Sequence, residues 1–383
     1  MKTPDRSWRL ALFLATSGHS GVDRIMKNLV GELGRRSIAV DLLQVEGHGP
    51  HFDRLPESVR RVPLGARHVN SCIPRLAWYL RTRKPSALLC DKDRVNRAAV
   101  VASRLAGYRG RLVLRVGTTV SKNLERRGPL HRQAQVFSIR RLYSRAHAVI
   151  VPSEGAAADL VRIGGFRDGF VRTVPSPVVS PELDALAGAP VEHPWFSDPS
   201  IPIVLGAGEL CARKDFATLI RAFAEVRKDR ECRLVILGKG RKRDELLGLA
   251  EDLRVSEHVW LPGFVGNPYA YMARASVFVL SSVCEGSPVV LMEALSLGTP
   301  VVSADCPSGP REILQAGRLG PLVPVGAHQA MAEAILRVLD SPPPRKALQE
   351  AALQFHVSRA ADAYLHLLGY PGCSMGGGRE NPA

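Results

Sequence analysis

Short apolar runs alternate with longer segments of helical periodicity along the whole chain. In the first half we predict strands at Leu10–Leu14, Ala39–Val45, Ala87–Cys90, Arg111–Val116, Ala148–Val151 and Val171–Val174. In the second half we predict strands at Ile203–Gly206, Arg233–Leu237, Val259–Leu261, Val277–Leu280, Pro300–Ser303 and Leu322–Val323. Strands separated by helical stretches are typical of βαβ units with parallel sheets. The pattern therefore predicts an α/β protein with two doubly wound, Rossmann-like sheets.

Prolines mark the boundary between the two halves. Residues 175–202 show little periodicity and contain Pro175, Pro177, Pro181, Pro190, Pro194, Pro199 and Pro202, as in a linker. We therefore predict one domain over 1–177 and a second over 178–355. Parallel α/β sheets bind ligands at the carboxyl ends of their strands, so we expect the domains to face a central cleft.

The end of the chain has a different pattern. Another proline cluster, Pro342–Pro344, precedes an apolar segment that predicts one helix over residues 345–368. The Gly-rich segment 371–383 is predicted to be a flexible tail.

The composition is that of a soluble globular protein, with 45% hydrophobic and 23% charged residues. No apolar run reaches the roughly 18 residues that span a bilayer. Leu10–Thr16 is short and is not followed by a cleavage site, so we interpret it as a buried strand and not a signal peptide. The seven cysteines are odd in number and none are spaced as Cys-x-x-Cys, which argues against a disulfide framework and a zinc site. We expect a reducing cytoplasm.

The net charge of +16 is unevenly distributed. Residues 1–177 carry 32 Lys and Arg against 13 Asp and Glu, a net of +19, whereas the remainder carries 20 against 23. This asymmetry indicates that the first half faces an anionic partner.

The strongest local signal runs from Phe278 to Pro300. An apolar strand is followed by a polar turn and a helix over about Pro288–Leu297, for which we predict Ser287 as the N-cap and Pro288 as the first helical residue. The free backbone N–H groups in the turn from Gly286 to Val289 would form an anion site that suits a diphosphate. Glu285 lies just before this turn, and Glu293 lies inside the helix, about 8 Å along its axis from the predicted first helical residue. The two carboxylates suit sugar or ribose hydroxyls.

This Glu-x7-Glu pattern resembles the donor-binding half of the retaining glycosyltransferases of glycosyltransferase family 4, the group 1 glycosyltransferases, which have the GT-B fold. The matching segments, in order, are LGAGELCARKDFATLIRAFAEV (205–226), CRLVILGKG (232–240), VWLPGFVGNPYAYMARASVFVLSSVCEGSPVVLMEA (259–294) and GTPVVSADCPSGPREIL (298–314). The first half shares only looser features, including SRAHAVIVPSE (144–154) and a glycine loop near Gly18.

The resemblance implies roles for particular residues. Glu285 would hold sugar hydroxyls and Glu293 the ribose hydroxyls. Lys214 and Arg213 would neutralise the diphosphate without a metal, because the charge that grows on the leaving group needs a positive partner. The turn Gly263, Phe264 and Val265 would sit against the base.

One position departs from the family. Glu209 stands in the segment Gly208–Glu209–Leu210 where relatives usually have an arginine at the phosphates. Arg213 could replace that arginine, or Glu209 could turn away or pair with Lys214. The reversed charge puts ordinary activity in doubt.

Three first-half motifs are weaker. The loop Gly18–Gly21 precedes a helix and would approach the donor phosphates or the acceptor; its His19 is interpreted as a loop residue and not a base. Many relatives carry a histidine where this chain has Arg115–Thr119, so Arg115, Thr118 or Thr119 could line that site. Asp91-Lys92-Asp93 resembles the Asp-x-Asp metal motif of a different glycosyltransferase fold, but Asp93 is a good N-cap and we expect no metal site.

These observations predict a cytoplasmic, metal-independent, retaining hexosyltransferase that uses a UDP- or GDP-sugar and needs no cofactor. The first domain would bind a glycan or lipid-linked acceptor, the second the donor, and, as in relatives, a C-terminal helix over about 356–370 would pack back on the first domain. The product would enter a cell-surface polysaccharide or glycolipid. The alternatives are an epimerase or phosphorylase of the same fold and a non-catalytic sugar-nucleotide-binding protein. Base, sugar, acceptor and oligomeric state stay open.

The positive first half predicts peripheral binding to an anionic membrane, on the inner face of the cell membrane, and not to nucleic acid, because no nucleic-acid motif accompanies the charge. Two basic amphipathic segments could make the contact, Ile73–Lys84 and Leu124–Arg145. Alternatively, both are ordinary helices that cover the sheet.

Overall fold

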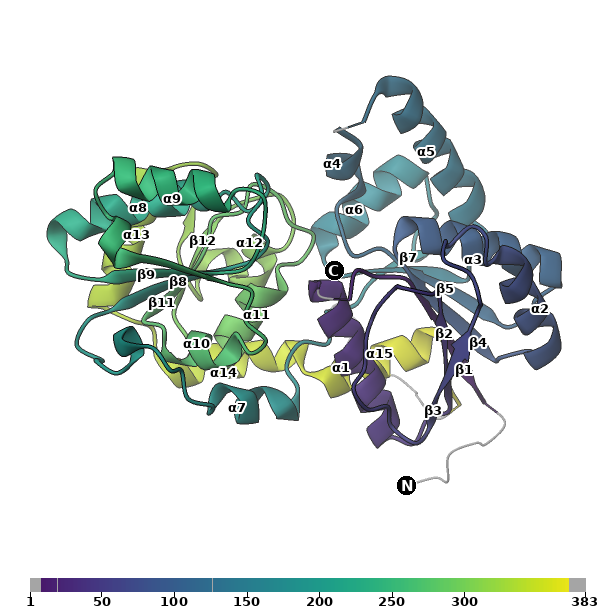
Figure 1. Ribbon diagram of the computed structural model, residues 1–383. Helices are drawn as coiled ribbons and strands as arrows, with labels where there is room; N and C mark the ends of the chain where they lie inside the picture. The colour runs from purple at the N-terminus through teal and green to yellow at the C-terminus, as the bar shows by residue number, and fades with distance from the viewer. Residues whose placement is uncertain (1–7, 19, 126, 372–383) are drawn as a thin grey trace, which may run out of the picture. The chain divides into compact units, whose positions relative to one another are not determined.

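The computed structural model describes residues 8–18, 20–125 and 127–371, which form two compact units (Figure 1). The first unit contains the chain up to Val178 together with the segment from His356, and the second unit is Val179–Phe355. Of the predicted flexible tail only residue 371 is described.

The first unit is built on a seven-stranded parallel sheet in the order β3-β2-β1-β4-β5-β6-β7. Its strands are β1 Leu10–Leu14, β2 Val40–Gln44, β3 Val59–Pro63, β4 Ala87–Asp91, β5 Arg111–Arg115, β6 Ala148–Val151 and β7 Val171–Thr173. The six predicted strands are present within two residues at each end. The edge strand β3 was not predicted from the sequence, because Arg60 and Arg61 are exposed and interrupt its apolar pattern.

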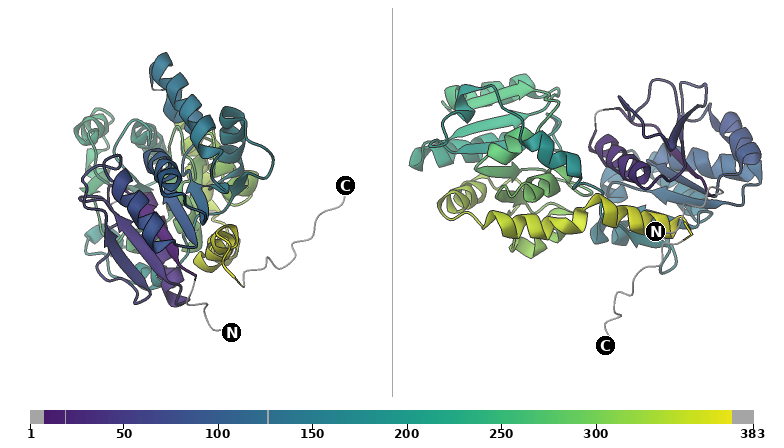
Figure 2. Two further views of the ribbon diagram at one scale, coloured as in Figure 1. Left: turned by 90° about the vertical axis from the view of Figure 1, so that its right-hand side faces the viewer. Right: turned by 90° about the horizontal axis from the view of Figure 1, so that it is seen from below.

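Helices cover both faces of this sheet. They are α1 Gly21–Arg35, α2 Ile73–Arg83, α3 Asp93–Ala106, α4 Val120–Glu125, α5 Pro129–Tyr143, α6 Glu154–Gly164 and α15 Val357–Leu367. Helices α2, α3, α5 and α6 contribute to one apolar core with one face of the strands. Helix α1 packs against α15, on the other side of the sheet (Figures 1 and 2).

A buried ion pair joins the C-terminal helix to this unit. Arg115, at the end of β5, donates to Asp91 at 2.9 Å and to the hydroxyl of Tyr364 in α15, also at 2.9 Å. All three side chains are buried. Arg115 therefore acts in the core, and the expectation that it could line a binding site is wrong.

The second unit has a six-stranded parallel sheet in the order β10-β9-β8-β11-β12-β13. The strands are β8 Ile203–Ala207, β9 Arg233–Leu237, β10 Val259–Gly263, β11 Val277–Leu280, β12 Val301–Ala304 and β13 Leu322–Val323. All six were predicted to within two residues. The order reverses between β8 and β11, and this switch point opens a place for ligands at the carboxyl ends of the strands.

The helices of the second unit also form two layers. Helices α8 Phe216–Asp229, α9 Arg243–Asp252 and α13 His328–Asp340 pack on one face, with α10 Tyr269–Arg274, α11 Val289–Ser296 and α14 Arg345–Ala352 on the other (Figure 1). Shorter elements are α7 Pro181–Ala187, α12 Pro310–Ile313 and the 3-10 turns η1 Pro194–Phe196, η2 Ser256–His258, η3 Gln315–Gly317 and η4 Leu353–Phe355.

The single helix predicted over 345–368 is instead two helices. Helix α14 ends at Ala352, the 3-10 turn η4 follows, and α15 begins at Val357. His356 has extended backbone angles, and its ring accepts a hydrogen bond from the N–H of Ser358, so it caps α15. The apolar periodicity continues across this break, which is why the sequence pattern did not reveal it.

Candidate functional site

The candidate site of the second unit lies in the loops that follow β8 and β11. These two strands are neighbours in the sheet, so their carboxyl ends bring together residues that are about 70 positions apart. The loop after β8 carries Arg213 and Lys214, and the loop after β11 carries Ser282 and Glu285. We refer to these four side chains as the carboxylate–cation cluster.

The carboxylate of Glu285 is held by three donors. Lys214 Nζ lies 2.7 Å from Glu285 Oε1, which also accepts from Ser282 Oγ at 2.8 Å. Arg213 donates to Oε2 at 3.0 Å. Lys214, Ser282 and Glu285 are buried, whereas the Arg213 side chain is about one-third exposed.

The neighbouring positive charges determine the ionisation state of the Glu285 carboxylate. Burial alone raises the pKa of Glu285, but the positive charges of Lys214 and Arg213 and the hydrogen bonds from Lys214 and Ser282 outweigh it and hold the pKa below its ordinary value. Glu285 is therefore an anion at neutral pH, and the cluster has a net charge of +1 that suits a phosphate-containing ligand.

A glycine makes room for the lysine. A Cβ atom at Gly208 would lie 2.9 Å from Lys214 Cε and 3.2 Å from its Cδ, closer than side chains normally approach. The hydroxyl of Ser281 donates to the carbonyl oxygen of Lys214 at 2.8 Å and fixes the backbone of the same residue. The stem of Lys214 is thus held between the ends of the two strands.

The turn after Glu285 leads directly into helix α11. Gly286 and Pro288 are buried, and Ser287 and Val289 are half-buried. The helix begins one residue later than predicted: Pro288 occupies the N-cap position, and no side chain caps the helix. The predicted cap by Ser287 is therefore wrong. Without a side-chain cap, the first turn of the helix has N–H groups available to an anion.

Glu293 lies in the same helix and is fully buried. Tyr269, the first residue of α10, donates its hydroxyl to Glu293 Oε1 at 3.2 Å. A solvated surface position for Glu293 is thus excluded, and the tyrosine orients the carboxylate.

The predicted base-binding turn follows β10. Gly263 ends that strand, and Phe264 beyond it has a half-exposed ring. The ammonium of Lys239, in the loop after β9, lies 5.7 Å from the centre of this ring. Val265 is half-buried beside it in the chain.

Glu209 occupies the loop after β8 and is exposed. Among the residues that the structure describes, no cation forms an ion pair with it, because Lys214 and Arg213 both pair with Glu285. Of the possibilities left open by the sequence, the pairing of Glu209 with Lys214 is thus excluded.

The glycine loop of the first unit follows β1. Gly18 has φ +91°, and a Cβ there would lie 2.5 Å from the ring of His51, so the position requires glycine. Gly21 is the first residue of α1, which Ser20 and Asp23 cap reciprocally. His19 lies outside the described residues. A part for this loop in donor binding stays a prediction.

The Asp-x-Asp segment is fully engaged in other contacts. Asp91 is buried against Arg115, and Asp93 accepts from Tyr143, Gln135 and Arg97. Asp93 is the first helical residue of α3 and not its N-cap, which is Lys92. Over the described part of the chain, no group of three or more His, Cys, Asp or Glu side chains is arranged to hold a metal ion. Thr119 is buried, and Thr118 accepts from Asn123 at 2.9 Å.

The sequence pattern missed four residues of this site. They are Ser281, Ser282, Tyr269 and Lys239, whose contacts are with residues that the pattern did identify. The two serines directly follow the apolar strand that precedes Glu285, a polar pair at the carboxyl end of a parallel strand, and this signal could have indicated them. No comparable signal precedes Tyr269.

Both units match models of known families. Residues 194–355 match the glycosyl transferases group 1 model, and residues 20–177 match the glycosyl transferase 4-like domain. The solved structure of HepE from Anabaena in complex with UDP-glucose has a similar fold, with a TM-score of 0.75 at 18% identity over 94% of this chain and 99% of that one. Another similar structure is the apo lipopolysaccharide outer core galactosyltransferase WaaB, with a TM-score of 0.71 at 17% identity over 94% and 99% of the two chains.

Curated relatives give the family. The N-acetylgalactosamine-N,N'-diacetylbacillosaminyl-diphospho-undecaprenol 4-alpha-N-acetylgalactosaminyltransferase of Campylobacter jejuni is 33% identical over 282 residues, which cover 72% of this chain and 74% of the relative. The lipopolysaccharide core biosynthesis glycosyltransferase LpsE of Rhizobium meliloti is 36% identical over 172 residues, 44% of this chain and 49% of the relative. Two family models in sequence, a relative of this coverage and the two parallel-sheet units agree, and the chain belongs to the group 1 glycosyltransferases of the GT-B fold.

Proposed function

We propose that this glycosyltransferase moves a hexosyl group from a UDP- or GDP-sugar to a glycan or lipid-linked acceptor, with retention of the anomeric configuration and without a metal ion. The observation that carries the proposal is the carboxylate–cation cluster, in which Lys214 and Arg213 are fixed around Glu285 at the switch point of the sheet. A nucleoside diphosphate needs positive partners at such a place when its bond to the sugar breaks.

The site residues divide among the parts of the donor. Lys214, Arg213 and the first turn of α11 would bind the diphosphate. Glu285 would accept hydrogen bonds from sugar hydroxyls, and Glu293, oriented by Tyr269, from the ribose hydroxyls. The ring of Phe264 would contact the base.

The chemical step follows from these assignments. An oxygen of the acceptor hydroxyl bonds to the anomeric carbon on the face from which the diphosphate departs. The bond between that carbon and the phosphate oxygen breaks, and its electron pair stays with the diphosphate. A departing phosphate oxygen takes the acceptor proton, so no carboxylate is needed as a general base. Lys214 and Arg213 stabilise the charge that develops on the diphosphate.

Relatives suggest the class of acceptor. The Campylobacter jejuni relative is named for a diphospho-undecaprenol acceptor, and the Rhizobium meliloti relative for lipopolysaccharide core biosynthesis. We therefore propose that this chain acts in the assembly of a cell-surface polysaccharide or glycolipid, and we further propose that it does so in the cytoplasm. The first unit would bind the acceptor and the second the donor.

The exposed Glu209 favours one second candidate, a non-catalytic protein that binds a sugar nucleotide, because its charge opposes a diphosphate. An experiment with radiolabelled UDP- and GDP-sugars distinguishes the possibilities. The purified protein is incubated with each donor, with and without a membrane extract and with and without EDTA.

A transferase forms a labelled product only when the extract supplies the acceptor, and EDTA leaves its rate unchanged. Conversion of the donor without extract would indicate an epimerase or a phosphorylase. Binding of the donor without any product, in the presence of extracts that support transfer by a related enzyme, would indicate a non-catalytic protein. Activity that EDTA abolishes and Mn²⁺ restores would contradict the metal-free mechanism.

A further inference from the structure

Helix α5 of the first unit is unusually exposed for a helix that covers a sheet. Every residue from Arg127 to Ala134 is exposed, and only Ile139 and Tyr143 of the helix are buried. The first half of α5 accordingly projects beyond the neighbouring helices of its unit, as both views show (Figures 1 and 2). We call residues 127–145 the α5 arm.

Two large apolar side chains on the arm face solvent. Leu130 is 82% exposed and Phe137 is 69% exposed. They are seven residues apart, which places them on one side of the helix. Burial of such side chains is the main source of binding energy between proteins and apolar surfaces. The arm therefore exposes two large apolar side chains on one side of the helix.

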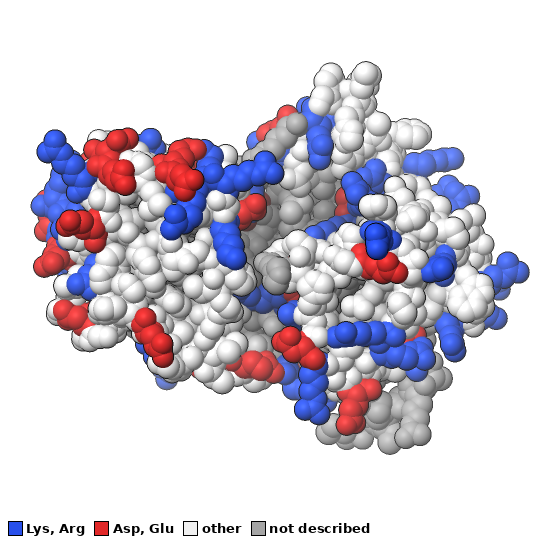
Figure 3. Space-filling model, viewed as in Figure 1, with Lys and Arg blue, Asp and Glu red and all other residues white. Residues whose placement is uncertain are grey.

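All charged residues of the arm are basic. The sequence from Arg126 to Ser153 contains six arginines and no aspartate or glutamate. The five in the described part of the chain, Arg127, Arg132, Arg140, Arg141 and Arg145, form no ion pair with a described carboxylate. Lys and Arg also predominate over Asp and Glu on the visible face of the first unit (Figure 3).

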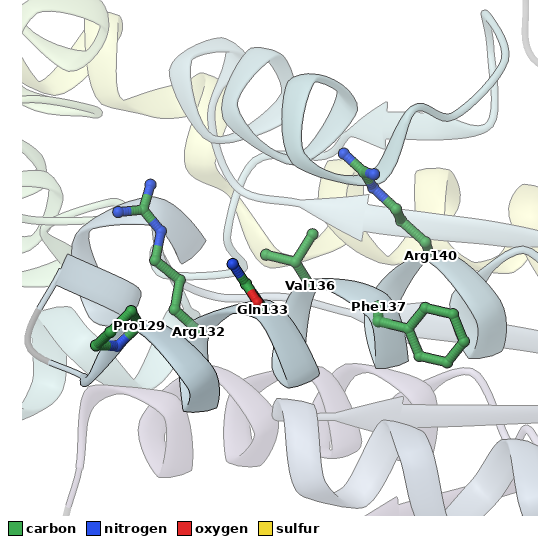
Figure 4. Close-up of a pocket in the computed structure, with 6 residues that line it drawn as sticks. All are labelled: Pro129, Arg132, Gln133, Val136, Phe137 and Arg140. Carbon is green, nitrogen blue, oxygen red and sulfur yellow. The ribbon is translucent and has the colours of Figure 1, made fainter.

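A shallow pocket of about 480 Å³ runs along the arm. It is lined by Pro129, Arg132, Gln133, Val136, Phe137 and Arg140. Arg132, Val136 and Arg140 project to the same side of the helix, so cationic groups and apolar groups share one surface (Figure 4). Arg140 is fixed there by its hydrogen bond to the carbonyl oxygen of Ile163 at 2.8 Å.

The other basic amphipathic segment, α2, is different. Its apolar residues Leu76, Tyr79 and Leu80 are buried, and the hydroxyl of Tyr79 donates to the buried Asp41 at 2.6 Å. Only Trp78 is left as an exposed large apolar residue of that helix, at 66%. The apolar face of helix α2 is thus mostly buried in the core, whereas α5 exposes Leu130 and Phe137 to solvent.

We propose that the α5 arm docks on the surface of an anionic lipid bilayer. Leu130 and Phe137 enter the interface between headgroups and acyl chains, and the arginines contact the anionic headgroups. Charge complementarity selects this occupant: all charged residues of the arm are basic, and they match a negatively charged membrane. The proposal rests on the proposed function in one respect, the lipid-linked acceptor, which such docking would bring within reach of the enzyme.

The test is sedimentation of the full-length protein with vesicles, in the absence of donor and acceptor. Vesicles of phosphatidylcholine alone are compared with vesicles containing equal parts of phosphatidylcholine and phosphatidylglycerol, at low and at physiological salt. Binding is expected only to the anionic vesicles and is expected to weaken as salt screens the charges. Each arginine near the surface contributes about fivefold to the partition coefficient.

Matched double variants test whether α5 or α2 makes the contact with the membrane. Arg127→Glu with Arg141→Glu, which lie beside Leu130 and Phe137 on the arm, should lower the partition coefficient at least about 25-fold. Arg81→Glu with Arg83→Glu at the exposed end of α2 makes the same change in net charge and should have a much smaller effect. Leu130→Ala with Phe137→Ala should weaken binding about tenfold or more without changing thermal stability, because both side chains are exposed.

Absence of binding to anionic vesicles at low salt would overturn the proposal, as would an equal effect of the α2 and α5 variants. Equal binding to neutral vesicles would also contradict it. None of these measurements depends on transfer activity, so a failure here leaves the proposed glycosyl transfer standing, and an enzyme without transfer activity could still bind vesicles through the arm.

Discussion

Lys214 Nζ lies 2.7 Å from Glu285 Oε1, and both side chains are buried. The residue proposed to bind the diphosphate is therefore paired with the residue proposed to bind the sugar. The ammonium group is held by Glu285, and the backbone of Lys214 is held by the hydroxyl of Ser281 at the end of β11. Preorganised charge of this kind is a major source of catalysis.

Removal of the lysine should be among the most damaging single changes. Lys214→Ala is expected to lower the rate of sugar transfer about 10²- to 10³-fold, because the leaving diphosphate loses its most buried positive partner. Arg213→Ala should cost less, since its side chain is about one-third exposed. Initial rates at saturating donor measure both effects.

The control for this series is Lys242→Ala, a lysine of the same unit that pairs with Glu245 on the surface. It should retain the wild-type rate. Retention of more than half of the rate by Lys214→Ala, with the fold intact by circular dichroism, would show that the diphosphate is stabilised elsewhere.

The pair of Tyr269 and Glu293 provides a test of ribose recognition. If Glu293 binds the ribose hydroxyls, Glu293→Ala should weaken binding of the free nucleoside diphosphate about 10- to 100-fold. The wild-type protein should also prefer the ribonucleotide to its 2′-deoxy analogue, and this preference should shrink in the variant. Calorimetric titration measures both affinities.

Tyr269→Phe should weaken binding of the ribonucleotide by a smaller factor, because it removes only the hydroxyl that orients the carboxylate of Glu293. Tyr271→Phe, in the same helix, is the control and should bind as the wild type does. An unchanged preference for ribose in Glu293→Ala would assign this glutamate a purely structural role.

Glu209→Arg should leave the fold stable and tighten the binding of a nucleoside diphosphate. Its side chain is exposed and pairs with no described cation, so the substitution breaks no ion pair of the described structure. The new positive charge lies in the same loop as Arg213 and Lys214, where it attracts phosphate. Thermal melting and calorimetry provide the two readouts. A stable variant of unchanged affinity would show that this side chain points away from the phosphates.

The buried ion pair between Arg115 and Asp91 predicts a stability effect. Arg115→Met leaves Asp91 buried without its charged partner, at a cost of about 3–5 kcal/mol in the free energy of unfolding. The double variant Arg115→Met with Asp91→Leu removes the uncompensated charge and should recover much of this loss. Urea denaturation, monitored by tryptophan fluorescence, measures the free energy of unfolding of each variant. A cost below about 1 kcal/mol for the single variant would mean that water reaches the carboxylate.

The sequence was sufficient to predict elements whose residues are buried on both faces. Leu10–Leu14 and Val277–Leu280 are continuous apolar runs, and the structure has these strands with the same limits. The strand at Val59–Pro63 was missed because an edge strand with exposed arginines lacks that pattern. A helix break at His356 was missed because a histidine side chain replaces a more familiar cap.

Local motifs identified Glu285, Glu293 and Lys214, but not the contacts among them. The ion pair of Lys214 with Glu285 joins residues 71 positions apart, and only the pairing of β8 with β11 brings them together. The sequence also could not separate the two basic helices. Helices α2 and α5 have similar compositions, and their difference lies in what each packs against, which tertiary structure decides.

In the proposed mechanism, Glu285 acts on the sugar while the cations around it bind the diphosphate. One paired measurement on Glu285→Gln tests it most directly: the rate of sugar transfer, together with the calorimetric affinity for the free nucleoside diphosphate of the same donor. Loss of the negative charge frees Lys214 and Arg213 for the phosphates. We therefore expect the rate of transfer to fall at least about hundredfold, and the affinity for the diphosphate to equal that of the wild type or to be tighter. Transfer at the wild-type rate, or a diphosphate affinity lost in parallel with transfer, would contradict it.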